Sequence, residues 1–230
     1  MNPLVTIITP TYNKPTYFAE CADSVLAQNH DRWVWWPVIN GLEYLDAYTF
    51  PDDPRIVPTW FPAADSLRGQ FHVTARIVNW IYPKVQTPYI YFLADDDLID
   101  PDGLAELVYV MEEEWAGDAC YGRCDVYNEQ PDGTFKFAAW CGEGYDIGLG
   151  CETQPDCFID SSQILHTKEL WDKATADGWQ LTDSNDPETC GHADGILLNR
   201  LAEFATFHYV PQRIVSHRRT KLSSWHKPQV

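Results

Sequence analysis

Short apolar runs alternate with amphipathic stretches along the first half of the chain. The apolar runs are rich in β-branched and aromatic residues and lack helical spacing, which predicts buried strands. The stretches between them repeat apolar side chains at helical spacing, with Pro15 at the start of the first and Pro83 after the second. The expected strands are residues 4–10, 32–39 and 89–93, and the expected helices are residues 15–29, 68–82 and 104–115.

This order of elements predicts an α/β fold with a largely parallel central sheet flanked by helices. Pro37 lies inside the second expected strand, which favours an edge position or a bulge there. Residues 51–65 are rich in Pro and Asp and predict a loop, with a short strand around Ile56 and Val57.

The second half of the chain predicts a hairpin, two long polar loops and two further helices, with no composition shift that marks a domain boundary. We therefore expect one domain, residues 1–230. The hairpin strands are residues 119–129 and 134–140, the loops are 141–157 and 178–192, a strand and helix lie within 161–174, and the last helix contains Leu197 to Ala205.

The strongly acidic composition excludes some partners. A net charge of -18 repels a phosphate backbone or an anionic membrane, so a nucleic-acid partner is not expected. The one basic segment is "HRRTKLSSWHK", residues 217–227. No apolar run is long enough to span a bilayer and the N-terminus lacks signal-peptide features, which predicts a cytoplasmic protein without a transmembrane segment.

The seven cysteines are irregularly spaced and include no CxxC pair, which does not favour a disulfide framework. A structural zinc site remains an alternative, although the spacing is not a zinc signature. Its ligands would be Cys141, Cys151, Cys157, Cys190 and His192.

Three adjacent carboxylates, Asp95, Asp96 and Asp97, follow the strand at 89–93 directly. In an open α/β sheet the carboxyl ends of the strands carry the ligand site, so this triplet should meet "PTYNKP" (10–15) and "NGLE" (40–43) there. An Asp-x-Asp at a strand end aims two carboxylates at one hard cation. The alternative is a solvated acidic turn, with Asp100 and Asp102 capping the next helix.

Two segments resemble the family-two glycosyltransferases of the GT-A fold. They are "VTIITPTYNKPTYFAECADSVLAQ" and "FLADDDLIDPDGL", and the resemblance covers most of residues 4–115. It implies a nucleoside diphosphate sugar donor, Mn²⁺ or Mg²⁺ as cofactor, a donor-binding part at 1–115 and an acceptor-side part at 116–230. The implied donor-binding residues are Pro10, Thr11, Tyr12, Asn13, Asn40, Arg76, Asn79, Asp95 and Asp96.

The resemblance also implies metal ligands and a base. Asp97 is the expected metal ligand, together with Asp95 and with His217 of "VPQRIVSHRRTKLSS". Asp194, in "CGHADGILLNRLAEF", matches the family's catalytic base. The alternative interpretation is that Asp194 only caps the helix that follows. Arg218, Arg219 and Lys221 would contact phosphates.

Three positions depart from the family's pattern. Asn40 replaces an Asp that contacts the nucleoside, Ala94 stands at the usual first Asp of the acidic motif, and Ala193 replaces a Glu. An Asn side chain still offers a donor and an acceptor to a base or ribose.

The implied function is a metal-dependent inverting glycosyltransferase that moves a sugar from a UDP- or dTDP-sugar to the hydroxyl of a glycan or other acceptor. Trp140, Tyr145 and Trp179 are candidates for stacking on the acceptor or for core packing. Two alternatives stay open. A nucleotidyltransferase that makes a nucleotide sugar would need a glycine-rich first loop, which "TPTYNKP" lacks, and a non-catalytic binding module would retain the fold without turnover.

Overall fold

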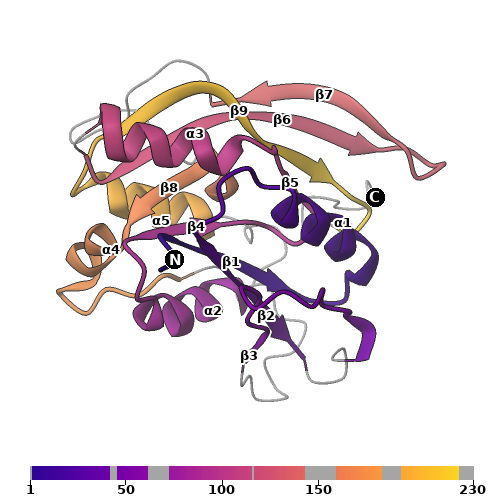
Figure 1. Cartoon of the computed structure of the whole chain (residues 1–230), viewed down its shortest axis with the longest axis horizontal. Coiled ribbons are helices and arrows are strands. Elements are labelled where there is room, and N and C mark those ends of the chain that lie inside the picture. The colour runs from indigo at the N-terminus through magenta and orange to yellow at the C-terminus, as the bar shows by residue number, and fades with distance from the viewer. Residues whose placement is uncertain are drawn as a thin grey trace.

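A computed structural model describes residues 2–41, 46–61, 73–115, 117–142, 159–182 and 193–222. One sheet of nine strands runs through this part of the chain, in the order β3-β2-β1-β4-β8-β6-β9-β5, with β7 paired to β6 (Figure 1). The strands are β1 (Val5–Thr11), β2 (Trp33–Asn40), β3 (Thr59–Phe61), β4 (Tyr89–Phe92), β5 (Leu98–Ile99), β6 (Ala119–Glu129), β7 (Phe135–Cys141), β8 (Ile164–Thr167) and β9 (Phe207–Arg219).

The first four strands are parallel to one another, as the sequence predicts. β1 lies between β2 and β4, and β3 pairs with the other side of β2. Beyond β4 the sheet becomes mixed, because β8 is antiparallel to both β4 and β6. β9 then runs parallel to β6, and β5 and β7 add antiparallel strands. The predicted α/β fold with a mostly parallel central sheet is confirmed.

Both faces of the sheet are covered by helices. The helices are α1 (Pro15–Leu26), α2 (Val73–Ile81), α3 (Gly103–Tyr109), α4 (Lys168–Thr175) and α5 (Ala193–Ala202), with 3₁₀ turns η3 (Tyr82–Lys84) and η6 (Ser161–Gln163) and a π-helix η4 (Val110–Glu114). α1 and α3 pack on one face, and α2, α4 and α5 pack on the other. None of these helices is long and apolar enough to cross a membrane.

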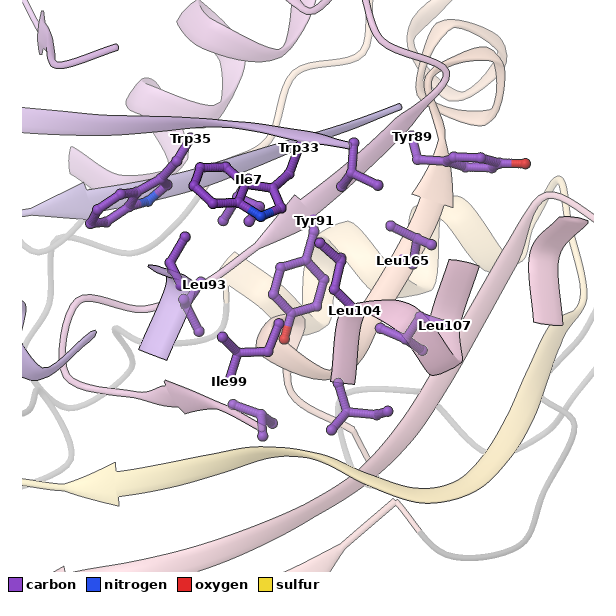
Figure 2. Packing of buried hydrophobic residues seen from close by; sticks show 14 of the residues in the cluster. Ile7, Trp33, Trp35, Tyr89, Tyr91, Leu93, Ile99, Leu104, Leu107 and Leu165 are labelled. Atoms are coloured by element: carbon purple, nitrogen blue, oxygen red, sulfur yellow. The ribbon is translucent and has the colours of Figure 1, made fainter. Parts of the chain in front are cut away.

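Strand alternation divides the core into two layers. Successive side chains of a strand point to opposite faces, so Ile7 enters one hydrophobic cluster and Ile8 enters the other. Tyr91 joins the cluster of Ile7, beside Leu104 and Leu107 of α3 (Figure 2). Each strand of this part is therefore apolar on both faces, which accounts for the short continuous apolar runs in the sequence.

Pro37 lies inside the sheet rather than at its edge. It pairs with Thr9 of β1, and β3 begins its pairing with β2 only at Val38. On the side of β3, the Trp35 N–H donates to the Arg55 carbonyl, and the Trp35 carbonyl accepts the Val57 N–H. Proline has no N–H to continue that series, so the outer ladder is interrupted at Pro37 and resumes one residue later.

Several helix boundaries differ from those expected. α1 ends at Leu26 rather than near residue 29, and α5 ends at Ala202 rather than reaching Ala205. α2 ends at Ile81, and Pro83 lies inside the following 3₁₀ turn; residues 62–72, where the helix was expected to begin, lie outside the described residues. The expected helix at 104–115 is α3 followed by the π-helix, and Trp115 closes it with an N–H donated to Val110. The predicted caps at Asp100 and Asp102 are wrong: neither side chain caps α3, whose Leu104 N–H is accepted by Gln28 at 3.1 Å.

β9 was not predicted from the sequence. Its thirteen residues include Pro211 and five charged or histidine side chains, so neither strand alternation nor an apolar run is visible. The segment expected to be a basic tail is instead paired with β6 and β5 inside the sheet. Its Arg218 is buried, so the described part of the basic segment does not form an exposed basic patch around this residue.

The remaining expectations concern the hairpin, the two polar loops and the residues expected on them. β6 has the predicted bounds and β7 is shifted by one residue. Most of both long loops lies outside the described residues, with Tyr145 and four of the expected zinc ligands, Cys151, Cys157, Cys190 and His192. Trp140 on β7 is exposed, and Trp179 is partly buried against the core.

His166 on β8 should make stability depend on pH. Its Nδ1 donates to the Thr167 carbonyl at 2.9 Å, whereas Nε2 is buried and has no hydrogen-bond partner among the described residues. Burial lowers the pKa of His166 to about 4, below the value of about 6.5 for a solvated histidine. The unfolded chain therefore binds a proton at a pH where the folded chain does not, and this group destabilises the fold as pH falls from about 7 to about 5.

His166→Leu removes this titration. Wild type should lose about 2 kcal/mol more of its free energy of unfolding than His166→Leu between about pH 7 and about pH 5. Urea unfolding of both proteins at the two pH values measures the difference, because the other titrating groups contribute equally to both. Equal losses in the two proteins would contradict the assignment.

Candidate functional site

The acidic triplet forms the turn that follows β4 at the carboxyl end of the parallel strands. All three side chains are buried, with exposed fractions of 6% for Asp95, 5% for Asp96 and 0% for Asp97. The solvated acidic turn is therefore excluded. Burying three carboxylates on consecutive residues is costly unless each has cations or hydrogen-bond donors around it.

Asp95 is bound by the loop that follows β1. Its Oδ2 accepts from the Thr11 hydroxyl at 2.8 Å and from the Tyr12 N–H at 3.3 Å, and Lys14 Nζ lies 3.2 Å from Oδ1. Burial raises the pKa of Asp95 to about 6, although Lys14 acts in the opposite direction. The residues that resemble the family's donor loop thus hold the acidic turn.

Asp96 shares the same lysine. Lys14 Nζ lies 2.8 Å from its Oδ2, which also accepts from the Thr220 hydroxyl at 3.1 Å. Lys14 is itself mostly buried, and its two carboxylate partners raise its pKa against the opposing effect of burial. Lys14 is therefore the counter-ion of both Asp95 and Asp96, a role that the sequence did not reveal.

Asp97 is bound by β9 and by the turn before β8. Its Oδ2 accepts from the Ser162 hydroxyl at 3.0 Å and lies 3.2 Å from His217 Nδ1, while its Oδ1 accepts from the Arg218 N–H at 2.9 Å. Burial raises the pKa of Asp97 even though His217 acts to lower it. Burial would lower the pKa of His217, but the Asp97 carboxylate outweighs it and raises that pKa to about 10.

Asp97, Asp160 and His217 form a group whose ligand atoms all lie within 4.8 Å of one another. Asp160 belongs to the capping turn of η6, where its Oδ1 accepts from the Ser162 N–H at 2.8 Å. The two carboxylates suit Mn²⁺ or Mg²⁺, and His217 would join them as a ligand only after losing its proton. Asp160 lies 63 residues after Asp97 in the sequence and carries no motif, so only the fold brings it here.

The expected metal ligand Asp95 is not part of this group. Its carboxylate is engaged by Thr11, Tyr12 and Lys14, which lie on the side of β1. Asp97 and His217, in contrast, are brought together as the resemblance implies.

The loop after β1 has a fixed shape. The hydroxyl of Tyr48, which the sequence did not single out, lies 2.9 Å from the Thr11 hydroxyl and accepts the Lys14 N–H at 3.1 Å. Asn13 has a φ of 51°, a left-handed conformation that only a small minority of non-glycine residues adopt. This conformation turns the chain so that Tyr12 and Lys14 both reach Asp95.

Asn40 lies at the same edge of the sheet as the triplet. It ends β2, one residue beyond the Ile39 that pairs with Thr11. The side chain is 5% exposed, and its Oδ1 is buried with no hydrogen-bond partner in the described part of the chain. A buried unpaired oxygen beside the loop that follows β1 is open to an N–H from a ligand.

The other expected donor residues lie on α2. The carboxamide of Asn79 accepts the Leu181 N–H at 2.9 Å and donates to the Leu181 carbonyl at 2.8 Å, which ties α2 to the segment after α4. Arg76 is exposed on the same helix. Asp194 is the second residue of α5 and is half-buried.

The "SVLAQ" part of the resemblance has a structural explanation. Gln28 Nε2 donates to the Asp100 carbonyl at 2.7 Å, and Ser24 Oγ accepts the Ile99 N–H at 3.2 Å. Together with the cap of α3 by Gln28, these bonds fix the chain where it leaves the acidic turn. The motif therefore helps to position the triplet through the residues that follow it in the chain.

Arg218 joins the triplet to α1. Its Nε donates to the Asp96 carbonyl, Nη1 forms an ion pair with Glu20, and Nη2 donates to the Tyr17 carbonyl at 3.3 Å. Because these protein acceptors engage its guanidinium, Arg218 is a structural residue here. The exposed Arg219 and Lys221 are better placed to meet a phosphate.

Solved structures with this architecture include those of TarS from S. aureus. The TarS 1–349 structure superposes with a TM-score of 0.64 at 12% identity, covering 95% of this chain and 60% of that one. The complex with UDP gives 0.65 and the complex with UDP-GlcNAc gives 0.64, each at 12% identity. The fold is GT-A.

A curated relative is Protein CgeD of Bacillus subtilis (strain 168), 25% identical over 214 residues, which cover 90% of this chain and 48% of CgeD. The chain thus spans about half the length of this relative. None of the protein-family models searched matches the chain.

Removing Lys14 should destabilise the GT-A domain. Lys14→Ala leaves Asp95 and Asp96 buried without their shared cation, which should cost about 3–5 kcal/mol in the free energy of unfolding. The matched control is Lys173→Ala, whose pairs with Asp118 and Glu169 are exposed and should contribute no more than about 1 kcal/mol. Urea unfolding at neutral pH measures both.

A second variant identifies the cause. Adding Asp95→Asn and Asp96→Asn to Lys14→Ala removes the uncompensated charges and should recover part of the lost stability. If Lys14→Ala is as stable as Lys173→Ala, the buried ion pair is not a main support of the turn.

Proposed function

We propose that this chain is a metal-dependent inverting glycosyltransferase that moves a sugar from a nucleoside diphosphate sugar to an acceptor hydroxyl. The observation that carries the proposal is the meeting of the donor loop, the buried acidic triplet and His217 at the carboxyl ends of the parallel strands. Ligands of open α/β sheets bind at that edge. The GT-A fold is consistent with this use of the edge.

A divalent cation, Mn²⁺ or Mg²⁺, would be held by Asp97, Asp160 and His217. Such a cation would supply positive charge that offsets the charge developing on the diphosphate leaving group. Compared with the ligands expected from the sequence, this assignment keeps Asp97 and His217, adds Asp160 and removes Asp95. Asp95 orders the donor loop through Thr11, Tyr12 and the shared Lys14.

The proposed donor carries a pyrimidine base, with UDP favoured over dTDP. TarS, which shares the fold, has been solved with UDP and with UDP-GlcNAc. Pro10, Thr11, Tyr12 and Asn13 would form one wall of the nucleoside pocket, and Asn40 would offer its unpaired oxygen to an N–H of the base. Asn79 contributes by holding α2 in place, and Arg76 remains a candidate for the exposed rim.

Asp194 would act as the base that takes the proton from the acceptor hydroxyl. It lies in the first turn of α5, where the helix dipole favours the ionised form. An ionised carboxylate accepts a proton as the hydroxyl attacks the anomeric carbon. The acceptor would be a glycan or another hydroxyl compound, bound on the side of residues 116–230.

Incubation with a panel of nucleotide sugars and Mn²⁺ tests the reaction class. Slow release of nucleoside diphosphate supports a glycosyltransferase. Pyrophosphate-dependent release of nucleoside triphosphate from a nucleotide sugar supports a nucleotidyltransferase, and binding without any turnover supports a non-catalytic module.

Asp97→Asn tests the metal assignment. The amide lacks the charge that pairs with a cation, so the variant should lose Mn²⁺-dependent UDP binding, and removal of metal by a chelator should have the same effect on wild type. Isothermal titration with UDP measures both. Asp102→Asn, on the same segment but outside the group, is the control and should bind as wild type.

Asp194→Asn tests the base. Loss of general-base catalysis should reduce transfer by about 10²–10⁴-fold while UDP binding and the melting temperature stay unchanged. If Asp194 only caps α5, Asn is an equally good cap and transfer should continue at the wild-type rate. A turnover assay paired with a melting curve separates the two roles.

A further inference from the structure

Two cysteines face each other across the β6–β7 hairpin, beside the proposed metal group. Cys124 on β6 and Cys141 on β7 are direct partners in the antiparallel register. Residues opposed in this way have Cα atoms about 4.5–5.5 Å apart, and disulfides span roughly 4.4–6.8 Å between Cα atoms. The backbone therefore needs no rearrangement to place a disulfide between them.

The two thiols are cross-strand neighbours and are not equivalent. Both are free, and each influences the pKa of the other. Cys124 is fully buried, whereas Cys141 is partly exposed. An external reagent thus reaches Cys141 first, and Cys124 is in position to resolve the product.

The other described cysteines lack this arrangement. Cys21 and Cys120 are fully buried and each donates to a backbone carbonyl, of Ala94 at 3.6 Å and of Leu107 at 3.5 Å. Burial raises the pKa of both thiols, as it also helps to do for Cys124, so the difference is one of position: Cys120 is opposite Leu165 on β8 rather than opposite another cysteine. Cys120, on the same strand as Cys124, is therefore a matched control.

Cys141 is linked to the metal group through one amide. Its thiol donates to Gln163 Oε1 at 3.4 Å, and the same oxygen accepts the Asp160 N–H at 2.7 Å. Gln163 Nε2 donates to the Gly122 carbonyl at 2.6 Å, and Gly142 leaves the amide room, since an added Cβ there would lie 2.2 Å from Nε2. A disulfide sulfur has no proton to donate, so oxidation removes one of the bonds that hold Gln163 and, through it, Asp160.

We propose that Cys124 and Cys141 form a reversible disulfide by exchange with a low-molecular-weight disulfide, and that this modification weakens metal binding at Asp97, Asp160 and His217. The Cys141 thiolate attacks one sulfur of the reagent, forming a mixed disulfide and releasing one thiol. The Cys124 thiolate then attacks the Cys141 sulfur and releases the second thiol. The two protons from the protein end on the two released thiols, so the protein is oxidised by two electrons and the reagent is reduced by two.

Peptide mapping tests the linkage. The whole chain is incubated with oxidised glutathione, alkylated and digested without reductant. The expected result is a crosslinked pair of peptides containing Cys124 and Cys141, lighter than their sum by two hydrogens and separated by reductant. Cys120→Ser should retain the crosslink, Cys141→Ser should lose it, and Cys124→Ser should stop at a glutathione adduct on Cys141.

Linkage of Cys141 to another cysteine, or no linkage at all, would overturn the proposal. If Cys124→Ser does not fold, Cys141→Ser at the more exposed position still decides the outcome.

The coupling to the metal group rests on the proposed function, whereas the linkage does not. Titration of oxidised and reduced protein with Mn²⁺ should show an affinity about 10-fold lower for the oxidised form, and treated Cys141→Ser should bind as the reduced wild type. Equal affinities despite a mapped disulfide would refute the coupling. Absence of Mn²⁺ binding in the reduced protein would instead count against the proposed metal site.

Discussion

The burial of three consecutive carboxylates is the constraint on which the site depends. Like charges on adjacent residues repel strongly where water cannot screen them. The fold compensates by bringing Lys14, His217 and the N–H of Arg218 to the same turn from both ends of the chain. β1, β4, β8 and β9 must therefore all be in register before the turn is stable, and the geometry of the site is inseparable from that of the sheet.

The sequence predicted the first half of this arrangement well. Apolar runs without helical spacing marked β1, β2 and β4, and the topological rule for α/β sheets placed the acidic triplet beside the loop after β1. Both inferences succeed because they depend on local pattern and chain order. The resemblance to a known family added His217, whose contact with Asp97 the structure shows.

The sequence could not predict the partners that arrive from elsewhere. Asp160 and Ser162 occur in an unremarkable polar stretch, and Tyr48 lies in a loop between β2 and β3. β9 was missed because its charged side chains, which belong to the site and to ion pairs, conceal the strand pattern. Functional demands on a strand therefore reduce the very signal by which strands are recognised in a sequence.

The position of β9 has a consequence for how the chain reaches its folded state. Asp97 and its partners His217 and Arg218 are 120 and 121 residues apart. At a synthesis rate of about 5–20 residues per second, a ribosome needs roughly 6–24 s to travel from one to the other. During that time the N-terminal strands have emerged, but Asp97 lacks the β9 groups that stabilise it. Completion of the sheet is therefore a late, long-range step. In a nascent chain the acidic turn would stay without these stabilising contacts until β9 has been synthesised.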